Sequence, residues 1–168
     1  MSKIGIFYGS NSGTTEGVAG SIKSALEAKG AEVELKDVAS ASKADLDGYQ
    51  NIIFGTSTWG MGDLQDDWVD FVEVVNDTDL SGKTVAIFGT GDQYGYPDTF
   101  VDGIGEIFES VSGAKVVGKW SVDGYEFDGS KGVIDGEFVG LVLDEDNQDN
   151  MSESRISDWV DSIIGSFA

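Results

Sequence analysis

Polar side chains crowd into a short loop near the start of the chain, in the stretch FYGSNSGTTEG (residues 7–17). An apolar run ends at Tyr8, and a helical pattern begins a few residues later. Hydroxyl groups and a carboxamide at such a place can cap the helix, or they can bind an anion together with the helix N-terminus. The residue types alone leave both interpretations open. The polar side chains surround Gly13 and are Ser10, Asn11, Ser12, Thr14 and Thr15.

No lysine or arginine occurs between residues 4 and 22. A phosphate bound in this loop would therefore be held by hydroxyl groups and by the unpaired main-chain N–H groups of the first helical turn. Gly13 lets the main chain approach a ligand closely because it has no Cβ. A helix cap needs only one or two hydroxyls. The abundance of hydroxyls therefore favours a phosphate site.

Two further loops are rich in glycine, hydroxyl and aromatic residues: GTSTWGMGDLQDD (55–67) and GTGDQYGYPD (89–98). Neither contains a familiar nucleotide motif. A GxGxxG starting at Gly89 would need glycine where Tyr94 stands, and GKT at 82–84 lacks the upstream glycine of a P-loop and leads into a strand. The acidic residues that a receiver domain needs are also absent after the first and third strands, where Tyr8-Gly9 and Gly55-Thr56 stand.

The composition excludes several kinds of chemistry. Cysteine and histidine are both absent, which excludes thiolate catalysis, Ser-His-Asp catalysis, iron–sulfur ligation and His-ligated zinc. The length of 168 residues predicts a single domain over 1–168. Met1, Ser2 and Lys3 lead directly into the first apolar run, so we expect no signal segment and a cytoplasmic protein.

Acidic residues outnumber basic ones by 31 to 10, which gives a formal net charge of −21. The excess is strongest between residues 44 and 114, where Lys83 is the only base against fourteen acids. Such a chain is repelled by nucleic acid and by anionic membranes, so we expect neither as a partner. The acidic run is either a solvated or halophilic surface, or a docking face for basic proteins.

Strand and helix patterns alternate along the chain. Strands are predicted over 3–8, 31–37, 51–56, 84–90 and 114–120, with a further extended piece over 138–144. Apolar residues recur at helical spacing over 18–26, 68–75, 104–111 and 156–167, Ser152 is the expected cap of the last helix, and a weak helix is expected near 45–50. This alternation predicts a parallel sheet covered on both faces, with ligands bound at the carboxyl ends of its strands.

The combination of SNSGTT, TSTWG and GTGDQYGYPD at these strand ends, followed by WSVDGYEF and LDEDNQ, resembles a flavodoxin of the long-chain type. The resemblance runs nearly end to end. It implies an α/β, doubly wound three-layer sandwich with a five-stranded parallel sheet of order 2-1-3-4-5. The polar segment 121–137 resembles the long-chain insertion, which would divide the fifth strand into two halves. Ser12 departs from the threonine that is more usual in the family.

The resemblance also implies that the cofactor is flavin mononucleotide (FMN), with its phosphate in the first loop. Aromatic rings would cover the flat isoalloxazine, and Trp59 and Tyr96 are the candidates because both lie in loops at the carboxyl edge. Asp146 is a candidate for the ribityl chain, or it is one more surface acid. The family further suggests that the Gly60–Met61 peptide turns over on reduction. The remaining predicted contacts come from the second and third loops and are Thr56, Ser57, Thr58, Gly60, Thr90, Gly91, Asp92 and Gln93.

A flavodoxin-like chain without His, Cys or an evident substrate pocket is expected to be a low-potential one-electron carrier rather than an enzyme, with FMN cycling mainly between semiquinone and hydroquinone. The alternatives are an FMN-dependent NAD(P)H quinone or nitro-group reductase on the same fold, and an acidic interaction domain without flavin. The family implies a monomer whose partners have basic docking faces, such as a ferredoxin/flavodoxin-NADP reductase, pyruvate oxidoreductase or nitrogenase reductase. Acids beside the predicted site would attract such partners and make the second one-electron potential negative. They are Asp63, Asp66, Asp67, Asp92 and Asp98.

Overall fold

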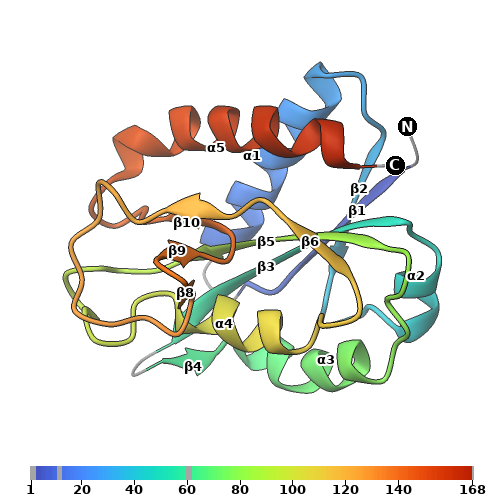
Figure 1. Cartoon of the computed structure of the whole chain (residues 1–168), viewed down its shortest axis with the longest axis horizontal. Coiled ribbons are helices and arrows are strands. Elements are labelled where there is room, and N and C mark those ends of the chain that lie inside the picture. Colours follow the sequence, from blue (N-terminus) through green and yellow to red (C-terminus); the bar gives the residue numbers. More distant parts are fainter. Residues whose placement is uncertain (1–2, 11–12, 60–61, 168) are drawn as a thin grey trace.

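A mainly parallel sheet runs through the middle of the molecule, with helices on both faces (Figure 1). The structure is a computed structural model and describes residues 3–10, 13–59 and 62–167, without the side chains of Trp59 and Asp63. The central strands β1 (Ile4–Tyr8) and β5 (Thr84–Thr90) are buried at every position, as expected for strands covered on both faces. Their neighbours are β2 (Val33–Asp37) and β3 (Asn51–Trp59), and the order β2-β1-β3-β5 begins the predicted 2-1-3-4-5 arrangement.

Two short strands share the fifth position of the sheet. β6 (Lys115–Val117) pairs with residues 84–86 of β5, and β10 (Leu141–Leu143) pairs with residues 88–90, both in parallel. The chain between them forms a small antiparallel sheet of β7 (Trp120–Ser121), β9 (Glu137–Phe138) and β8 (Val133–Ile134). The prediction of an edge strand divided by an insertion is therefore confirmed, and the strand order 2-1-3-4-5 is complete.

Helices α1 (Thr14–Ala28) and α5 (Asp149–Ile163) cover one face of the sheet, and α3 (Asp66–Asn76) and α4 (Asp102–Glu109) cover the other (Figure 1). A short 3-10 helix, η1 (Ile164–Ser166), directly follows α5 in the chain. The expected weak helix is α2 (Lys43–Asp47). Each face has its own core, with Trp68 fully buried in one and Trp159 in the other. The buried Trp68 indole donates its N–H to the carbonyl of Gly55 over 2.8 Å, so burial leaves no unpaired donor there.

Several element bounds differ from the sequence predictions, and two of these differences have a clear structural cause. β3 continues to Trp59 rather than ending at Thr56, because the short antiparallel strand β4 (Asp63–Leu64) pairs with its last two residues. Ser152 does not cap α5. That helix begins at Asp149 with Gln148 at the N-cap, and the buried Ser152 hydroxyl instead donates to the side chain of Glu145, which precedes the helix.

Over the part of the chain that the structure describes, no helix combines the length and the apolar character needed to cross a membrane.

Candidate functional site

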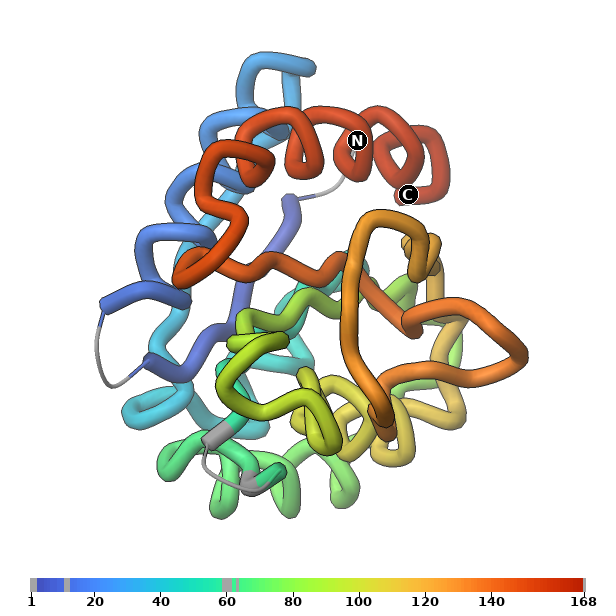
Figure 2. Tube along the Cα trace, turned by 90° about the vertical axis from the view of Figure 1, so that its left-hand side faces the viewer, coloured from blue at the N-terminus to red at the C-terminus, as the bar shows by residue number. Residues whose placement is uncertain are grey.

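The predicted site lies at the carboxyl ends of β1, β3 and β5. Figure 2 looks onto this end of the molecule, where the start of α1 (blue) and the loop after β5 (yellow-green) face the viewer together. Parallel strands bring their carboxyl ends to the same edge, so segments 75 residues apart in sequence become neighbours. The site predicted from three separate loops is therefore a single region in the fold.

The loop after β1 presents the N-terminus of α1. Gly13 stands at the N-cap with a φ of 88°, and among the described residues no heavy atom beyond its chain neighbours lies within 4 Å of the position that a Cβ would occupy. Its N–H donates to the Ser10 hydroxyl over 3.0 Å, while the N-cap residue itself contributes no side-chain cap to the helix. Exposed Gly13 and Thr14 thus mark an accessible helix N-terminus, which suits an anion. Asn11 and Ser12 lie outside the described residues.

Thr15 connects this loop to the end of β5. Its buried hydroxyl lies 3.1 Å from the hydroxyl of Thr90, across 75 residues of sequence. Since both hydroxyls are used within the protein, their contribution is to hold the two loops at a fixed separation. The sequence identified both residues but not their contact.

The end of β3 supplies Thr56, Ser57 and Thr58. The Thr56 hydroxyl donates to the carbonyl of Ser57 over 2.9 Å, and the Thr58 hydroxyl accepts the N–H of Gly103 at 2.9 Å. The second bond joins β3 to the first turn of α4. Trp59 ends the strand, which corrects its predicted placement in a loop. Gly60 and the Gly60–Met61 peptide lie outside the described residues.

The loop after β5 is organised around Asp92. Its carboxylate accepts the N–H groups of Gly95 at 2.8 Å and Tyr94 at 3.2 Å, and its carbonyl accepts the N–H of Tyr96 at 3.0 Å. The bond from Gly95 is the main reason that the pKa of Asp92 is lowered, against the opposing effect of its partial burial. The loop holds two exposed aromatic side chains, Tyr96 at 45% and Tyr94 at 59%. An exposed ring held on an ordered loop is well suited to stack on a flat ligand.

The main-chain N–H groups of Gly91 and Gln93 donate to residues 143–144, where the chain leaves β10. The N–H of Gly91 donates to the carbonyl of Leu143 over 3.1 Å. Gln93 is fully buried, and both its main-chain N–H and its side-chain amide donate to one carboxylate oxygen of Asp144, at 3.1 and 2.8 Å. Sequence reasoning selected Gln93 for its loop and missed Asp144, whose only signal was its place in the acidic run LDEDNQ.

Asp146 belongs to a group of three carboxylates at this edge. One oxygen each from Asp92, Asp144 and Asp146 lie within 4.8 Å of one another. The Asn147 side-chain amide bridges the first two, at 2.8 Å from Asp92 and 2.9 Å from Asp144. Desolvation, and after it the charges of Asp92 and Asp144, raises the pKa of Asp146. Asp146 is exposed and adjoins the predicted site through Asp92.

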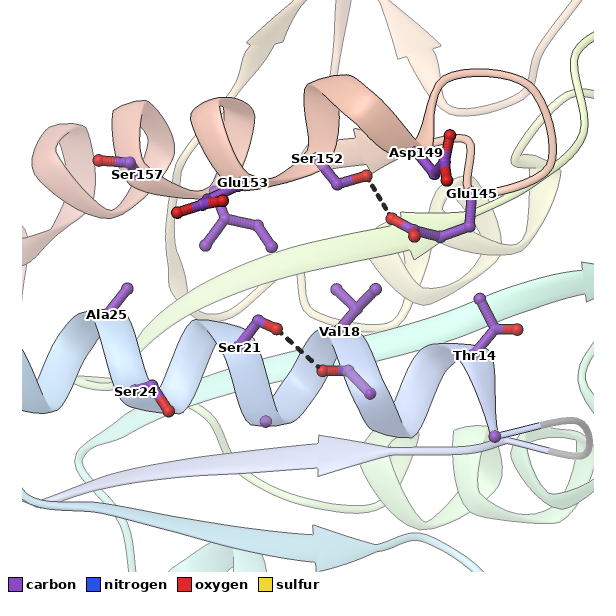
Figure 3. A pocket seen from close by; sticks show the side chains of 14 residues that line it. Thr14, Val18, Ser21, Ser24, Ala25, Glu145, Asp149, Ser152, Glu153 and Ser157 are labelled. Atoms are coloured by element: carbon purple, nitrogen blue, oxygen red, sulfur yellow. Dashed lines mark hydrogen bonds between the residues drawn. The ribbon is translucent and has the colours of Figure 1, made fainter.

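A groove of about 940 Å³ runs from the first turn of α1 along the seam between α1 and α5. Figure 3 shows Thr14 at one end and Ala25 farther along α1, opposite the carboxylates of Glu145, Asp149 and Glu153. Of the predicted site residues that the structure describes, Gly13 and Thr14 line it. Because carboxylates repel an anion, the part of the groove beyond Thr14 does not suit a phosphate.

Comparison with known proteins identifies the family to which this sequence is similar. The family model described as flavodoxin matches residues 6–159. A flavodoxin from a Nostoc species is 48% identical over 167 residues, covering 98% of this chain and 97% of its own length. A flavodoxin from Helicobacter pylori is 46% identical and aligns over the full length of both chains.

The solved structures agree with the sequence relatives. A crystal structure of a Fusobacterium nucleatum flavodoxin bound to flavin mononucleotide superimposes with a TM-score of 0.94 at 32% identity, covering all of both chains. The match extends over the divided edge strand and the insertion as well as the central sheet. The chain therefore belongs to the flavodoxin family.

Proposed function

We propose that this chain binds one FMN without a covalent bond and serves as a low-potential one-electron carrier between redox proteins. The observation that carries the proposal is the meeting, at one edge of the sheet, of an accessible helix N-terminus and an exposed tyrosine on an ordered loop. The flavodoxin from F. nucleatum, which has the same fold over its whole length, is described as bound to flavin mononucleotide. We further propose that residues 1–168 act as one FMN-binding domain.

The first loop has the donors that a phosphate needs. Ser10, Gly13, Thr14 and the predicted contacts Asn11 and Ser12 would supply hydroxyl, carboxamide and main-chain N–H groups at the start of α1. No basic side chain occurs between residues 4 and 22, so the helix N-terminus provides the favourable electrostatics. Thr15 would act mainly by tying this loop to Thr90.

The ring would lie between the loops that follow β3 and β5. Tyr96 and Trp59 are proposed to cover its two faces, while main-chain groups of residues 90–93 lie toward its polar edge. Within that stretch, the N–H groups of Gly91 and Gln93 already donate to Leu143 and Asp144. Direct contacts from these two residues would therefore come from other main-chain atoms. Asp146 is proposed to lie near the ribityl chain, because it adjoins Asp92.

FMN supplies the one-electron chemistry when bound, and the protein positions it and limits its contact with water. The chain has no histidine or cysteine for proton transfer or covalent catalysis. Relatives between 40% and 48% identical over nearly their full length are named flavodoxin, so the quinone or nitro-group reductase alternative receives no support. As a member of this family, the chain is an electron-transfer flavoprotein rather than a stand-alone enzyme.

Redox proteins are the partners that the family implies. We propose that they dock through basic surfaces, since the net charge of −21 favours a positively charged partner. A ferredoxin/flavodoxin-NADP reductase, pyruvate oxidoreductase and nitrogenase reductase are the candidates. We also propose that the chain is a cytoplasmic monomer.

The phosphate site predicts a clear difference between FMN and riboflavin. We expect apoprotein to bind FMN tightly and riboflavin at least tenfold more weakly, because riboflavin cannot use the donors at the start of α1. A titration of each flavin, followed by fluorescence quenching, measures both affinities. Equal affinities would contradict the phosphate assignment, and steady-state NAD(P)H oxidation without an added reductase would contradict the carrier function.

Replacing Tyr96 by alanine should weaken FMN binding by roughly 1 to 3 kcal/mol, because stacking and the exclusion of water from one ring face are lost. The same flavin titration measures this effect. Tyr94→Ala is the matched control, since it removes an equally large exposed ring from the same loop. If both variants bind FMN like the unchanged protein, Tyr96 does not cover the ring; if both lose affinity equally, the loop rather than the ring is responsible.

A further inference from the structure

Asp144 is a carboxylate with no exposed surface and no lysine or arginine in ion-pairing distance among the described residues. It directly follows β10, the half-strand that pairs with the end of β5. Burying a charge is costly unless hydrogen bonds replace the lost water. A carboxylate at this buried position therefore needs hydrogen-bond donors around it.

Four N–H groups converge on Asp144. Oδ2 accepts the main-chain N–H of Gln93 at 3.1 Å, the Gln93 side-chain amide at 2.8 Å and the Asn147 side-chain amide at 2.9 Å. Oδ1 accepts the main-chain N–H of Asn147 at 3.0 Å. All four are donors, so the arrangement suits a group that only accepts, as an ionised carboxylate does.

Through Gln93, the network reaches the insertion. The side-chain carbonyl of Gln93 accepts the N–H of Glu126 at 2.6 Å. Farther along the same loop, the carbonyl of Pro97 accepts the N–H groups of Asp128 and Gly129 at 2.7 and 2.9 Å. The loop that carries Tyr96 is therefore held on one side by Asp144 and on the other by the insertion.

We propose that Asp144 is a positioning residue: by holding both the main chain and the side chain of Gln93, it fixes the loop over residues 90–97 in the conformation that receives the flavin ring. The proposal rests on the proposed function and extends it to a residue that need not touch the cofactor. Asp144 and Gln93 at the centre of the network are fully buried, and among the described residues no buried side-chain nitrogen or oxygen lacks a hydrogen-bond partner. Removing the Asp144 acceptor therefore leaves the Gln93 donors unpaired in the interior. We therefore expect the loop over residues 90–97, and with it Tyr96, to become more mobile when Asp144 is replaced.

The test is the variant Asp144→Asn, which keeps the shape but turns one acceptor into a donor. We expect the affinities for FMN and for riboflavin to fall by a similar factor, about tenfold or more, because the ring loop changes and the phosphate loop does not. Amide hydrogen exchange of residues 91–96 in the apoprotein should become faster, while exchange in α1 stays as it was. Asp149→Asn is the matched control, since it makes the same charge change at an exposed position in the first turn of α5.

A second variant separates positioning from folding. Gln93→Met removes the polar side-chain amide that bonds to Asp144 and retains a side chain of similar size. Because the two residues interact directly, the losses of FMN affinity in Gln93→Met and in Asp144→Asn should not add in the double variant. Circular dichroism must show each apoprotein folded at the temperature of the titration. Unchanged exchange at 91–96, or faster exchange with unchanged flavin affinity, overturns the proposal. Failure of the unmodified protein to bind FMN would instead overturn the proposed function, and the exchange measurement would still show whether Asp144 holds the loop.

Discussion

Gly140→Ala is expected to destabilise the protein by roughly 3 kcal/mol, which corresponds to a fall in Tm of about 6 to 12 °C for a chain of this size. An ideal Cβ at Gly140 would lie 2.0 Å from the carbonyl oxygen and 2.6 Å from the carbonyl carbon of Ile87. Both atoms belong to the main chain of β5 at the centre of the sheet, and they cannot rotate away as a side chain can. Alanine therefore forces β10 away from β5.

Thermal and urea unfolding of the apoprotein measure this effect, and Gly20→Ala is the control. Gly20 lies inside α1, and no described heavy atom outside the adjacent helix backbone is within 4 Å of its Cβ position. Alanine is the better helix former there, so the same added methyl should stabilise by roughly 0.5 to 1 kcal/mol. A Gly140→Ala protein as stable as the unchanged one would show that β10 can move without cost.

The displacement of β10 should also reach the site. Leu143 at the end of β10 accepts the N–H of Gly91, and Asp144 follows directly. We therefore expect Gly140→Ala to lower flavin affinity as well as stability. The half-strand after the insertion thus supports both the sheet and the loop that carries Tyr96.

The central strands and the site loops were predictable because their signals are local. β5 was predicted at its observed bounds, since seven consecutive residues suitable for a buried strand are followed by the glycine-rich loop. The first loop was recognisable from its hydroxyls around Gly13, and the fully buried Trp68 and Trp159 from helical spacing.

The features that the sequence did not predict depend on specific contacts that leave no periodic pattern in the sequence. β3 extends to Trp59 because β4 pairs with it, and a two-residue strand has no periodicity to detect. Ser152 resembles a helix cap, but the helix begins a turn earlier and the hydroxyl is used by Glu145. The hydrogen bond between Gln93 and Asp144 spans 51 residues, so the sequence around either residue does not predict the contact.

The acids around the site are expected to control the second of the two one-electron potentials of bound FMN. Asp66 and Asp67 lie in the first turn of α3, at the same edge of the sheet as the site, and exposed Asp98 follows Tyr96 by two residues. A carboxylate about 10 Å from the flavin, partly screened by water, opposes the added negative charge by roughly 1 kcal/mol, or about 40 mV for one electron. Replacing all three by asparagine should therefore raise the second potential by about 100 mV, and asparagine at 67 can still accept the Gln65 side-chain bond.

A matched control places the same charge change at the opposite edge. Glu73, Asp77 and Glu109 are exposed acids at the C-terminal ends of α3 and α4, far along the helices from the strand ends that form the site. Converting them to their amides removes three negative charges without changing the field near the flavin to a comparable extent, because charges separated by more than about 10 Å are largely screened at 0.1 M salt. A redox titration followed at visible wavelengths compares the two triple variants.

The same two variants test the docking face. If the acids beside the site orient a basic partner, the Asp66, Asp67 and Asp98 variant should transfer electrons to a basic reductase more slowly at low salt and should lose much of the salt dependence of the unchanged protein. The control variant removes the same number of negative charges, so the general attraction to a basic partner weakens equally in both variants. Any difference between their rates therefore reports the orientation of the partner. Equal rates and equal potentials in the two variants would mean that the acidic run between residues 44 and 114 is a solvated surface, and that the potential is set by burial of the ring rather than by these charges.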